Sequence, residues 1–96
     1  METVDVKGKD IVAFVIDRNI HYEVKEFVEC EATAIVNGVE YNMLEYAVKG
    51  NKLASAYTLL ESGADPNTIT IEGITILQFA EDNNLNKMYS LLKEYI

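Results

Sequence analysis

Few side chains in this sequence could perform chemistry, and they are not grouped. His21 is the sole histidine and Cys30 the sole cysteine, which excludes a four-cysteine metal site and an intrachain disulfide. Glu29 and Glu31 flank Cys30, and their negative charge disfavours the thiolate form that a nucleophile requires. We expect a surface or capping role for His21 and a packing role for Cys30.

Carboxylates are plentiful, but their spacing does not favour acid–base catalysis. Glu23, Glu26 and Glu29 recur every three residues, as expected for a solvated helix face. The sequence has no glycine-rich phosphate loop, because the glycines from residue 38 onward each fit a turn. The sequence therefore predicts a protein that is not an enzyme and that uses no metal or cofactor.

The charge of the chain indicates the kind of partner. Sixteen acidic residues against eight basic ones give a net charge of -8. This charge repels nucleic-acid phosphates and anionic lipids, and it favours encounter with a basic protein surface. We expect the partner to be another protein, and a basic surface on that protein would complement the charge of this chain. We expect no binding to nucleic acid.

Apolar runs, the charge of the first residues and the cysteine count together indicate the cellular compartment. The longest apolar run, residues 11–16, is far shorter than the roughly 20 residues that span a bilayer. The first residues carry acid where a secretory signal carries base, and a single cysteine suits a reducing compartment. We expect a cytoplasmic protein that binds no membrane and is monomeric when free.

An internal repeat predicts the elements that would position a binding surface. Residues 42–47 align with residues 75–80 at a displacement of 33, and with residues 10–15 at a displacement of 32. Each copy begins with a residue that can cap a helix and then repeats one apolar helix face. The caps are Asp10, Asn42 and Thr75, and the recurring positions are Val12, Leu44 and Leu77, then Phe14, Tyr46 and Phe79, then Val15, Ala47 and Ala80.

A second helix and an extended segment complete each copy. Breaks at residues 18–19, 50–51 and 83–84 contain asparagine, which tolerates the conformation of a tight turn. Asn37-Gly38 lies between β-branched residues and is a strong hairpin signal, and Glu72-Gly73 is a weaker one. Each unit is therefore expected to be two helices followed by a hairpin.

One stretch carries a specific family resemblance. Residues 59–67 read Leu-Leu-Glu-Ser-Gly-Ala-Asp-Pro-Asn, and Gly73-Ile74-Thr75-Ile76-Leu77 and Ala80 follow. This stretch resembles the LLxxGADxN and GxTPLxxA signatures of the ankyrin-repeat family. Physically, Gly63 would end a helix in the left-handed conformation, and Asp65 would hydrogen-bond the turn that follows.

The resemblance implies an all-α repeat, an α-solenoid of ankyrin-like helix-turn-helix units linked by β-hairpin loops. A single domain would cover residues 1–96, with repeats at approximately 10–41, 42–74 and 75–96 and a leader at 1–9. The alternative is an α+β domain in which the two hairpins join into one small sheet. Only the register of the repeat argues against that alternative.

The family resemblance also implies where binding would occur. Stacked units present a concave surface of hairpin tips and first helices, and in the family that face recognises proteins. In this sequence its positions are Tyr41, Glu45, Lys49, Ile71, Glu72, Ile74, Gln78 and Asp82, joined by Asp17 and Arg18 from the first copy. Among them, Tyr41, Ile71 and Ile74 could anchor a partner or could instead pack against the next repeat.

These inferences together predict a non-catalytic protein–protein interaction module. It would bind a partner protein through the concave face of hairpins and inner helices. The alternative is an immunity or inhibitor protein that neutralises a toxin or enzyme by masking a basic active surface. The sequence does not separate a protein that tethers its partner from one that blocks it.

Overall fold

Six helices and two strands make up the part of the chain that the computed structural model describes, residues 10–29 and 32–96. The expected leader at residues 1–9 and the expectation for Cys30 lie outside the described residues, as does the side chain of His21. The elements in chain order are α1 (Ile11–Arg18), α2 (His21–Glu29), β1 (Thr33–Val36), β2 (Val39–Asn42), α3 (Met43–Lys49), α4 (Leu53–Glu61), α5 (Ile76–Asp82) and α6 (Asn86–Lys93).

Three helices start at the predicted capping residues. Asp10, Asn42 and Thr75 each accept a hydrogen bond from a backbone N–H two or three residues further on, at 3.0, 2.8 and 3.0 Å. Each bond satisfies one of the amides that the first turn of a helix leaves without an internal partner. The predicted caps of α1, α3 and α5 are therefore confirmed.

Left-handed residues make the turns that the sequence predicts. Asn19, Asn51 and Asn84 have φ angles of 50°, 54° and 59°, and each follows the first helix of a pair. Gly63, with φ of 104°, follows α4, and the side chain of Asp65 accepts a hydrogen bond from a backbone N–H at 2.8 Å. These predicted turns are confirmed.

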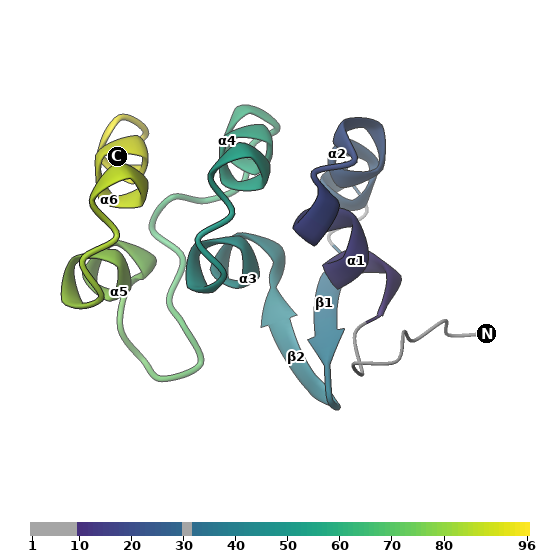
Figure 1. Ribbon diagram of the computed structural model, residues 1–96, viewed down its shortest axis with the longest axis horizontal. Helices are drawn as coiled ribbons and strands as arrows, with labels where there is room; N and C mark the ends of the chain where they lie inside the picture. Colours follow the sequence, from purple (N-terminus) through teal and green to yellow (C-terminus); the bar gives the residue numbers. More distant parts are fainter. Residues whose placement is uncertain (1–9, 30–31) are drawn as a thin grey trace.

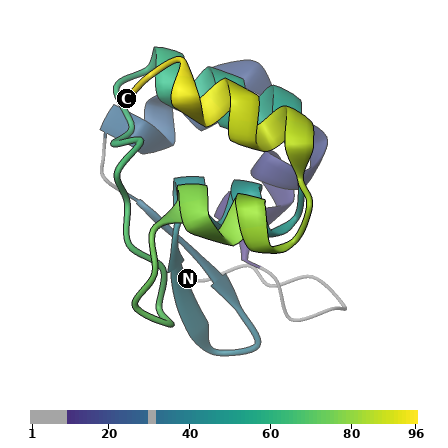
Figure 2. The ribbon, with the colours of Figure 1, turned by 90° about the vertical axis from the view of Figure 1, so that its left-hand side faces the viewer.

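The helices form three pairs, α1 with α2, α3 with α4 and α5 with α6, and the pairs lie side by side (Figure 1). In the end-on view, α1, α3 and α5 form one layer and α2, α4 and α6 form the other (Figure 2). Successive helices within each layer contact each other. The small side chains of Ala47, Ala56 and Ala80 are fully buried, which allows neighbouring helices to approach closely.

The predicted all-α fold class was wrong. β1 and β2 form a two-stranded antiparallel sheet, with Thr33 opposite Asn42 and Val36 opposite Val39. The sheet packs on α1, and a backbone hydrogen bond of 2.9 Å joins the N–H of Asp10 to the carbonyl of Ile35. The chain is therefore a mixed α/β globule measuring 37 × 25 × 19 Å, and it is not an all-α solenoid.

The physical reason for this sheet is the turn at its end. Asn37 and Gly38 have φ angles of 52° and 82°, the conformation of the two-residue turn whose twist matches paired strands. The second expected hairpin, in the loop 62–75, forms only an isolated bridge between Ile69 and Thr75. Among the described residues, the two segments do not join into one sheet, in contrast to the α+β alternative.

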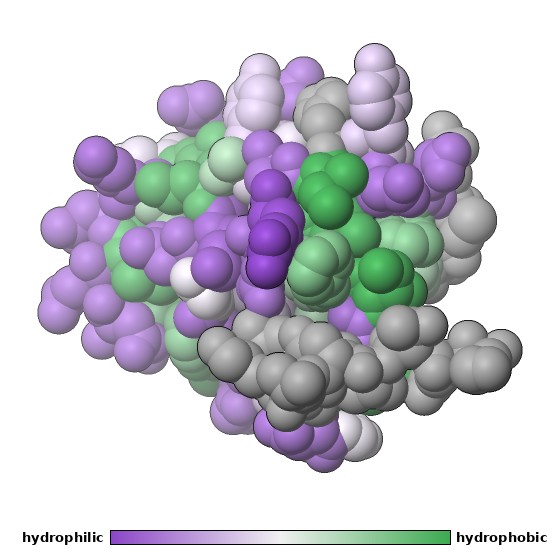
Figure 3. All heavy atoms as spheres, turned by 45° about the vertical axis from the view of Figure 1, so that its right-hand side comes forward, coloured by the Kyte–Doolittle hydropathy of each residue, from purple (hydrophilic) through white to green (hydrophobic). Residues whose placement is uncertain are grey.

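The surface differs along the molecule. On the face shown in Figure 3, polar side chains predominate toward α5 and α6, whereas apolar side chains gather nearer the end formed by α1 and α2. Ile11, the first residue of α1, and Ile20, between α1 and α2, are among the exposed apolar residues. None of the helices in the described part of the chain has the length and apolar character needed to cross a membrane.

Candidate functional site

The candidate site is the hairpin face, which we define as β1, β2, the loop 62–75 and the adjoining sides of α1, α3 and α5. The strands and the loop project from the layer that contains these three helices (Figures 1 and 2). The predicted binding residues come from β2 (Tyr41), α3 (Glu45, Lys49), the loop (Ile71, Glu72, Ile74) and α5 (Gln78, Asp82).

Three of the predicted residues form one charged network. The side chain of Lys49 donates hydrogen bonds of 2.7 and 2.8 Å to the two carboxylate oxygens of Glu72. Its Nζ also lies 3.1 Å from Oε2 of Glu45. The network therefore connects α3 to the loop, 23 residues further along the chain.

Glu45 is the buried member of this network. The residue is only 1% exposed, and its Oε2 accepts a hydrogen bond of 2.9 Å from the backbone N–H of Ile71. A buried carboxylate is costly unless it is paired and hydrogen-bonded, and both conditions are met here. Glu45 therefore holds the loop in place and is not itself available as a contact surface.

The contact between Lys49 and Glu72 shifts the pKa values of both groups. Burial, the largest single influence, acts to lower the pKa of Lys49, but hydrogen bonds and charges from Glu72 and Glu45 together raise it above the usual 10.5. The hydrogen bond from Lys49 is the main reason that the pKa of Glu72 falls below its usual 4.5. The charges of Lys49 and Glu72 therefore persist at neutral pH.

Two aromatic rings lie near the ammonium group of Lys49. Its Nζ lies 5.4 Å from the ring centroid of Tyr41 and 5.7 Å from that of Phe79. Both distances are within the range of cation–π attraction. Lys49 thus links β2, α3, the loop and α5 at one point.

The hairpin face also carries exposed apolar side chains. Ile71 is 57% exposed and Ile69 is 55% exposed, while Thr70 between them is buried. Val39, at the turn of the β1–β2 hairpin, is also exposed, and Ile74 is half-buried. Because its backbone is bound to Glu45, Ile71 is presented on an anchored loop.

The remaining predicted residues make local contacts. Gln78 donates a hydrogen bond of 2.8 Å to Asp82 on the exposed side of α5. Asp17 accepts a hydrogen bond of 2.8 Å from the hydroxyl of Tyr46, and the guanidinium of Arg18 lies 4.6 Å from the ring centroid of Phe14. Asp17 and Arg18 lie in the last turn of α1, whereas their partners Phe14 and Tyr46 lie in the middle of α1 and α3.

Sequence reasoning missed Val39, Ile69 and Phe79. The alternation of Ile69 and Ile71 with threonines was a usable signal, because alternate residues of an extended segment point to the same side. The contact of Lys49 with Phe79 has no comparable signal, since it joins residues 30 positions apart.

The hairpin face contains a hollow that we call the tyrosine groove. It has a volume of about 390 Å³ and lies between the ends of α1 and α3 and the hairpin. Its two aromatic rings, of Tyr41 and Tyr46, have centroids 6.3 Å apart and planes tilted by 48°. The lining residues are Asp17, Val36, Tyr41, Tyr46, Lys49, Gly50 and Lys52.

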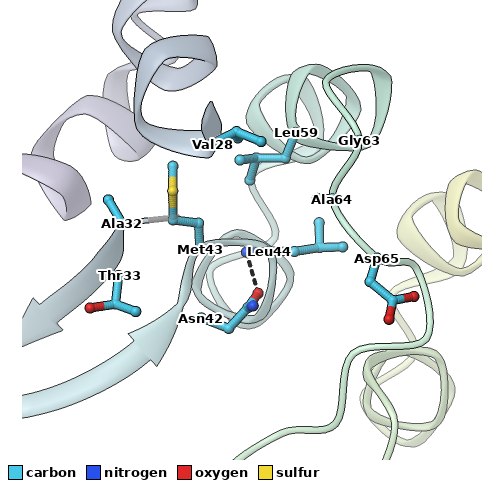
Figure 4. Close-up of a pocket in the computed structure, with 10 residues that line it drawn as sticks. All are labelled: Val28, Ala32, Thr33, Asn42, Met43, Leu44, Leu59, Gly63, Ala64 and Asp65. Atoms are coloured by element: carbon cyan, nitrogen blue, oxygen red, sulfur yellow. Dashed lines mark hydrogen bonds between the residues drawn. The ribbon is translucent and has the colours of Figure 1, made fainter. Parts of the chain in front are cut away.

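A second hollow, of about 310 Å³, lies between the ends of α2 and α4 and the start of α3 (Figure 4). Apolar side chains such as Met43 and Leu59 line it, and the side chain of Asn42 at its edge caps α3. Asp65, also at the edge, accepts a hydrogen bond within its own turn. Both polar groups therefore have structural roles.

Within the described residues, no three histidine, cysteine, aspartate or glutamate side chains gather in a way that could hold a metal ion. Comparisons of the chain with models of protein families, with curated proteins and with solved structures found no match. The function is therefore inferred from the residues and the geometry of this chain.

Proposed function

We propose that this chain is a non-catalytic protein–protein interaction module that binds a partner protein through its hairpin face. The observation that carries this proposal is Ile71, an exposed aliphatic side chain on a loop that a buried carboxylate anchors. Because the backbone of the loop is already anchored, binding through Ile71 costs little ordering of the loop, which favours its use as an anchor.

The neighbours of Ile71 support the same proposal. Ile69, two residues before Ile71, and Val39, on the neighbouring hairpin, add exposed apolar side chains to the same face, and apolar surface of this kind is typical of an interaction site. Glu40 and Glu72 lie beside these residues in the sequence and are exposed, so they would form an acidic rim. With a net charge of -8, this arrangement favours a partner with a basic surface.

A relationship to the ankyrin-repeat family is part of the proposal. Its support is the recurrence of a capped helix, an asparagine turn and a second helix at intervals of 32 and 33 residues. The left-handed Gly63 and the turn at Asp65 add to that support.

The proposal is tested by capturing the partner and then measuring its affinity for variants. Immobilised protein is used to recover partners from a lysate of the source cells, and the recovered partner is purified for calorimetry. Ile71→Glu places a charge at the proposed anchor, and we expect it to weaken binding by more than about tenfold.

The matched control is Ile96→Glu, because Ile96 is 58% exposed and lies at the end of the chain beyond α6. It should leave the affinity unchanged, and circular dichroism should show both variants folded. An affinity that is unchanged in Ile71→Glu, or reduced equally in both variants, would remove the hairpin face from the proposal.

The purified partner also separates tethering from inhibition. If the chain is an inhibitor or immunity protein, the partner's own activity will fall in proportion to the fraction bound. A tethering module will leave that activity intact at saturation. The Ile71→Glu variant serves as the non-binding control in either case.

A further inference from the structure

The tyrosine groove has features that the proposed anchor at Ile71 does not explain. Two aromatic rings and the carboxylate of Asp17 line it, and two of the chain's own ammonium groups lie against it. Lys49 is over the ring of Tyr41 at 5.4 Å, and Nζ of Lys52 is 4.0 Å from Oδ1 of Asp17. The two rings and the carboxylate attract cations, and the two ammonium groups show that cations of the chain itself already lie against them.

The two lysines are held very differently. Lys49 makes contacts of 2.7 to 3.1 Å with the carboxylates of Glu72 and Glu45, so its charge is matched within the protein. The ion pair of Lys52 with Asp17 is at the limiting distance for such a pair, and the lysine side chain is 40% exposed. An exposed pair of this kind contributes little to stability and is easily replaced.

We propose that the tyrosine groove binds an arginine side chain of a basic partner protein, with Lys52 occupying the cation position in the free protein. A guanidinium can stack on an aromatic ring and pair with a carboxylate at the same time, which an ammonium group does less well. A carboxylate accepts several hydrogen bonds, so the bond from the Tyr46 hydroxyl to Asp17 does not prevent a second donor from binding.

The charge of the whole chain favours this occupant over an anion. The whole chain has a net charge of -8, which opposes the approach of anions. This inference rests on the proposed function, because it names the part of the partner that the hairpin face recognises.

The test uses acetyl-arginine amide as the probe and acetyl-citrulline amide, which has a similar shape without the charge, as its control. Binding is followed by NMR through the ring protons of Tyr41 and Tyr46 and the amide of Gly50. We expect the arginine probe to shift these signals in a saturable way and the citrulline probe to leave them unchanged.

Two variants give opposite expected results. Asp17→Asn keeps an acceptor for the Tyr46 hydroxyl but removes the charge, and it should weaken arginine binding by about fivefold. Lys52→Ala removes the competing cation and should strengthen binding by about two- to threefold. The matched controls are Glu94→Gln and Lys87→Ala, which make the same charge changes at exposed positions near and on α6.

Several outcomes would overturn the proposal. They are no saturable response to the arginine probe, an equal response to citrulline, or weaker arginine binding in Lys52→Ala. Binding of acetyl-aspartate amide that is lost in Lys52→Ala would identify an anion site instead. If partner affinity falls in Ile71→Glu but not in Asp17→Asn, the arginine site is excluded while the proposed function stands.

Discussion

At the residue scale, the main finding is that a predicted contact residue has an internal role. Glu45 occupies a position that was expected to face a partner, yet it is buried and binds both the backbone of Ile71 and the side chain of Lys49. Glu72 is the exposed end of the same network. Binding at this face would thus depend on residues that never touch the partner.

Removing the carboxylate of Glu45 should therefore destabilise the protein. Glu45→Ala leaves the N–H of Ile71 without its acceptor and leaves Lys49 with Glu72 alone. We expect the free energy of unfolding to fall by about 2 kcal/mol, less than for a fully buried pair because the Lys49 side chain is 19% exposed. The measurement is urea denaturation at pH 7.

Two further variants isolate the cause. Glu45→Gln retains an acceptor and should lose less stability than Glu45→Ala. Glu81→Ala truncates an exposed glutamate of α5 and should change stability by no more than about 0.5 kcal/mol. Similar losses in Glu45→Ala and Glu81→Ala would show that the network does not hold the loop.

At the element scale, the two connecting segments differ in kind. Residues 33–42 form paired strands, because Asn37 and Gly38 adopt the left-handed angles that a two-residue turn requires. The loop 62–75 has one bridge, between Ile69 and Thr75, and depends on α3 for its anchoring. The first segment is held by its paired strands, whereas the loop combines backbone hydrogen bonds of its own, such as Thr70 N–H to the carbonyl of Ile74 at 2.7 Å, with the bond to Glu45 of α3.

A substitution at Gly38 should measure the contribution of the turn. A Cβ at this position would meet no atom within 4 Å, so the cost of Gly38→Ala comes from the φ of 82° alone. We expect it to lower the free energy of unfolding by about 1 kcal/mol. Thermal denaturation, monitored by circular dichroism, measures the stability of Gly38→Ala against that of the wild type.

Gly50→Ala is the matched control for this prediction. Gly50 has a φ of -88°, which any residue adopts, and its added Cβ would come no closer than 3.4 Å to the side chain of Lys52. Its stability should stay close to that of the wild type. A loss in Gly50→Ala equal to that in Gly38→Ala would contradict the role assigned to the left-handed turn.

At the scale of the whole molecule, charge and shape act together. Three helix pairs side by side place the hairpin, the loop and the inner helices on one face, and the chain carries a net charge of -8. A field of this sign accelerates the approach of a basic partner over distances of about 10 Å at 0.1 M salt.

Association with the captured partner should therefore depend on salt. Raising the ionic strength from about 0.05 M to 0.5 M shortens the screening length, and we expect the association rate constant to fall by about tenfold or more. The dissociation rate should change much less. Stopped-flow measurements that found the association rate independent of salt would exclude electrostatic steering by this surface.

The sequence alone determined the local features of this protein. Helix caps at Asp10, Asn42 and Thr75 and left-handed turns at the asparagines depend on residues a few positions apart, so their chemistry can be read directly from the chain. The hairpin turn at Asn37-Gly38 was predicted for the same reason, although its classification as a loop within an all-α fold was wrong.

Only the tertiary structure decided how those features combine. The burial of Glu45 against Ile71 and the contact of Lys49 with Phe79 join residues 26 and 30 positions apart, and they depend on how one helix pair lies against the next. From the sequence alone, a polar residue on a predicted helix face is expected to be exposed, because its neighbours in space are not known. The division between anchoring and contacting residues on the hairpin face therefore came from the packing.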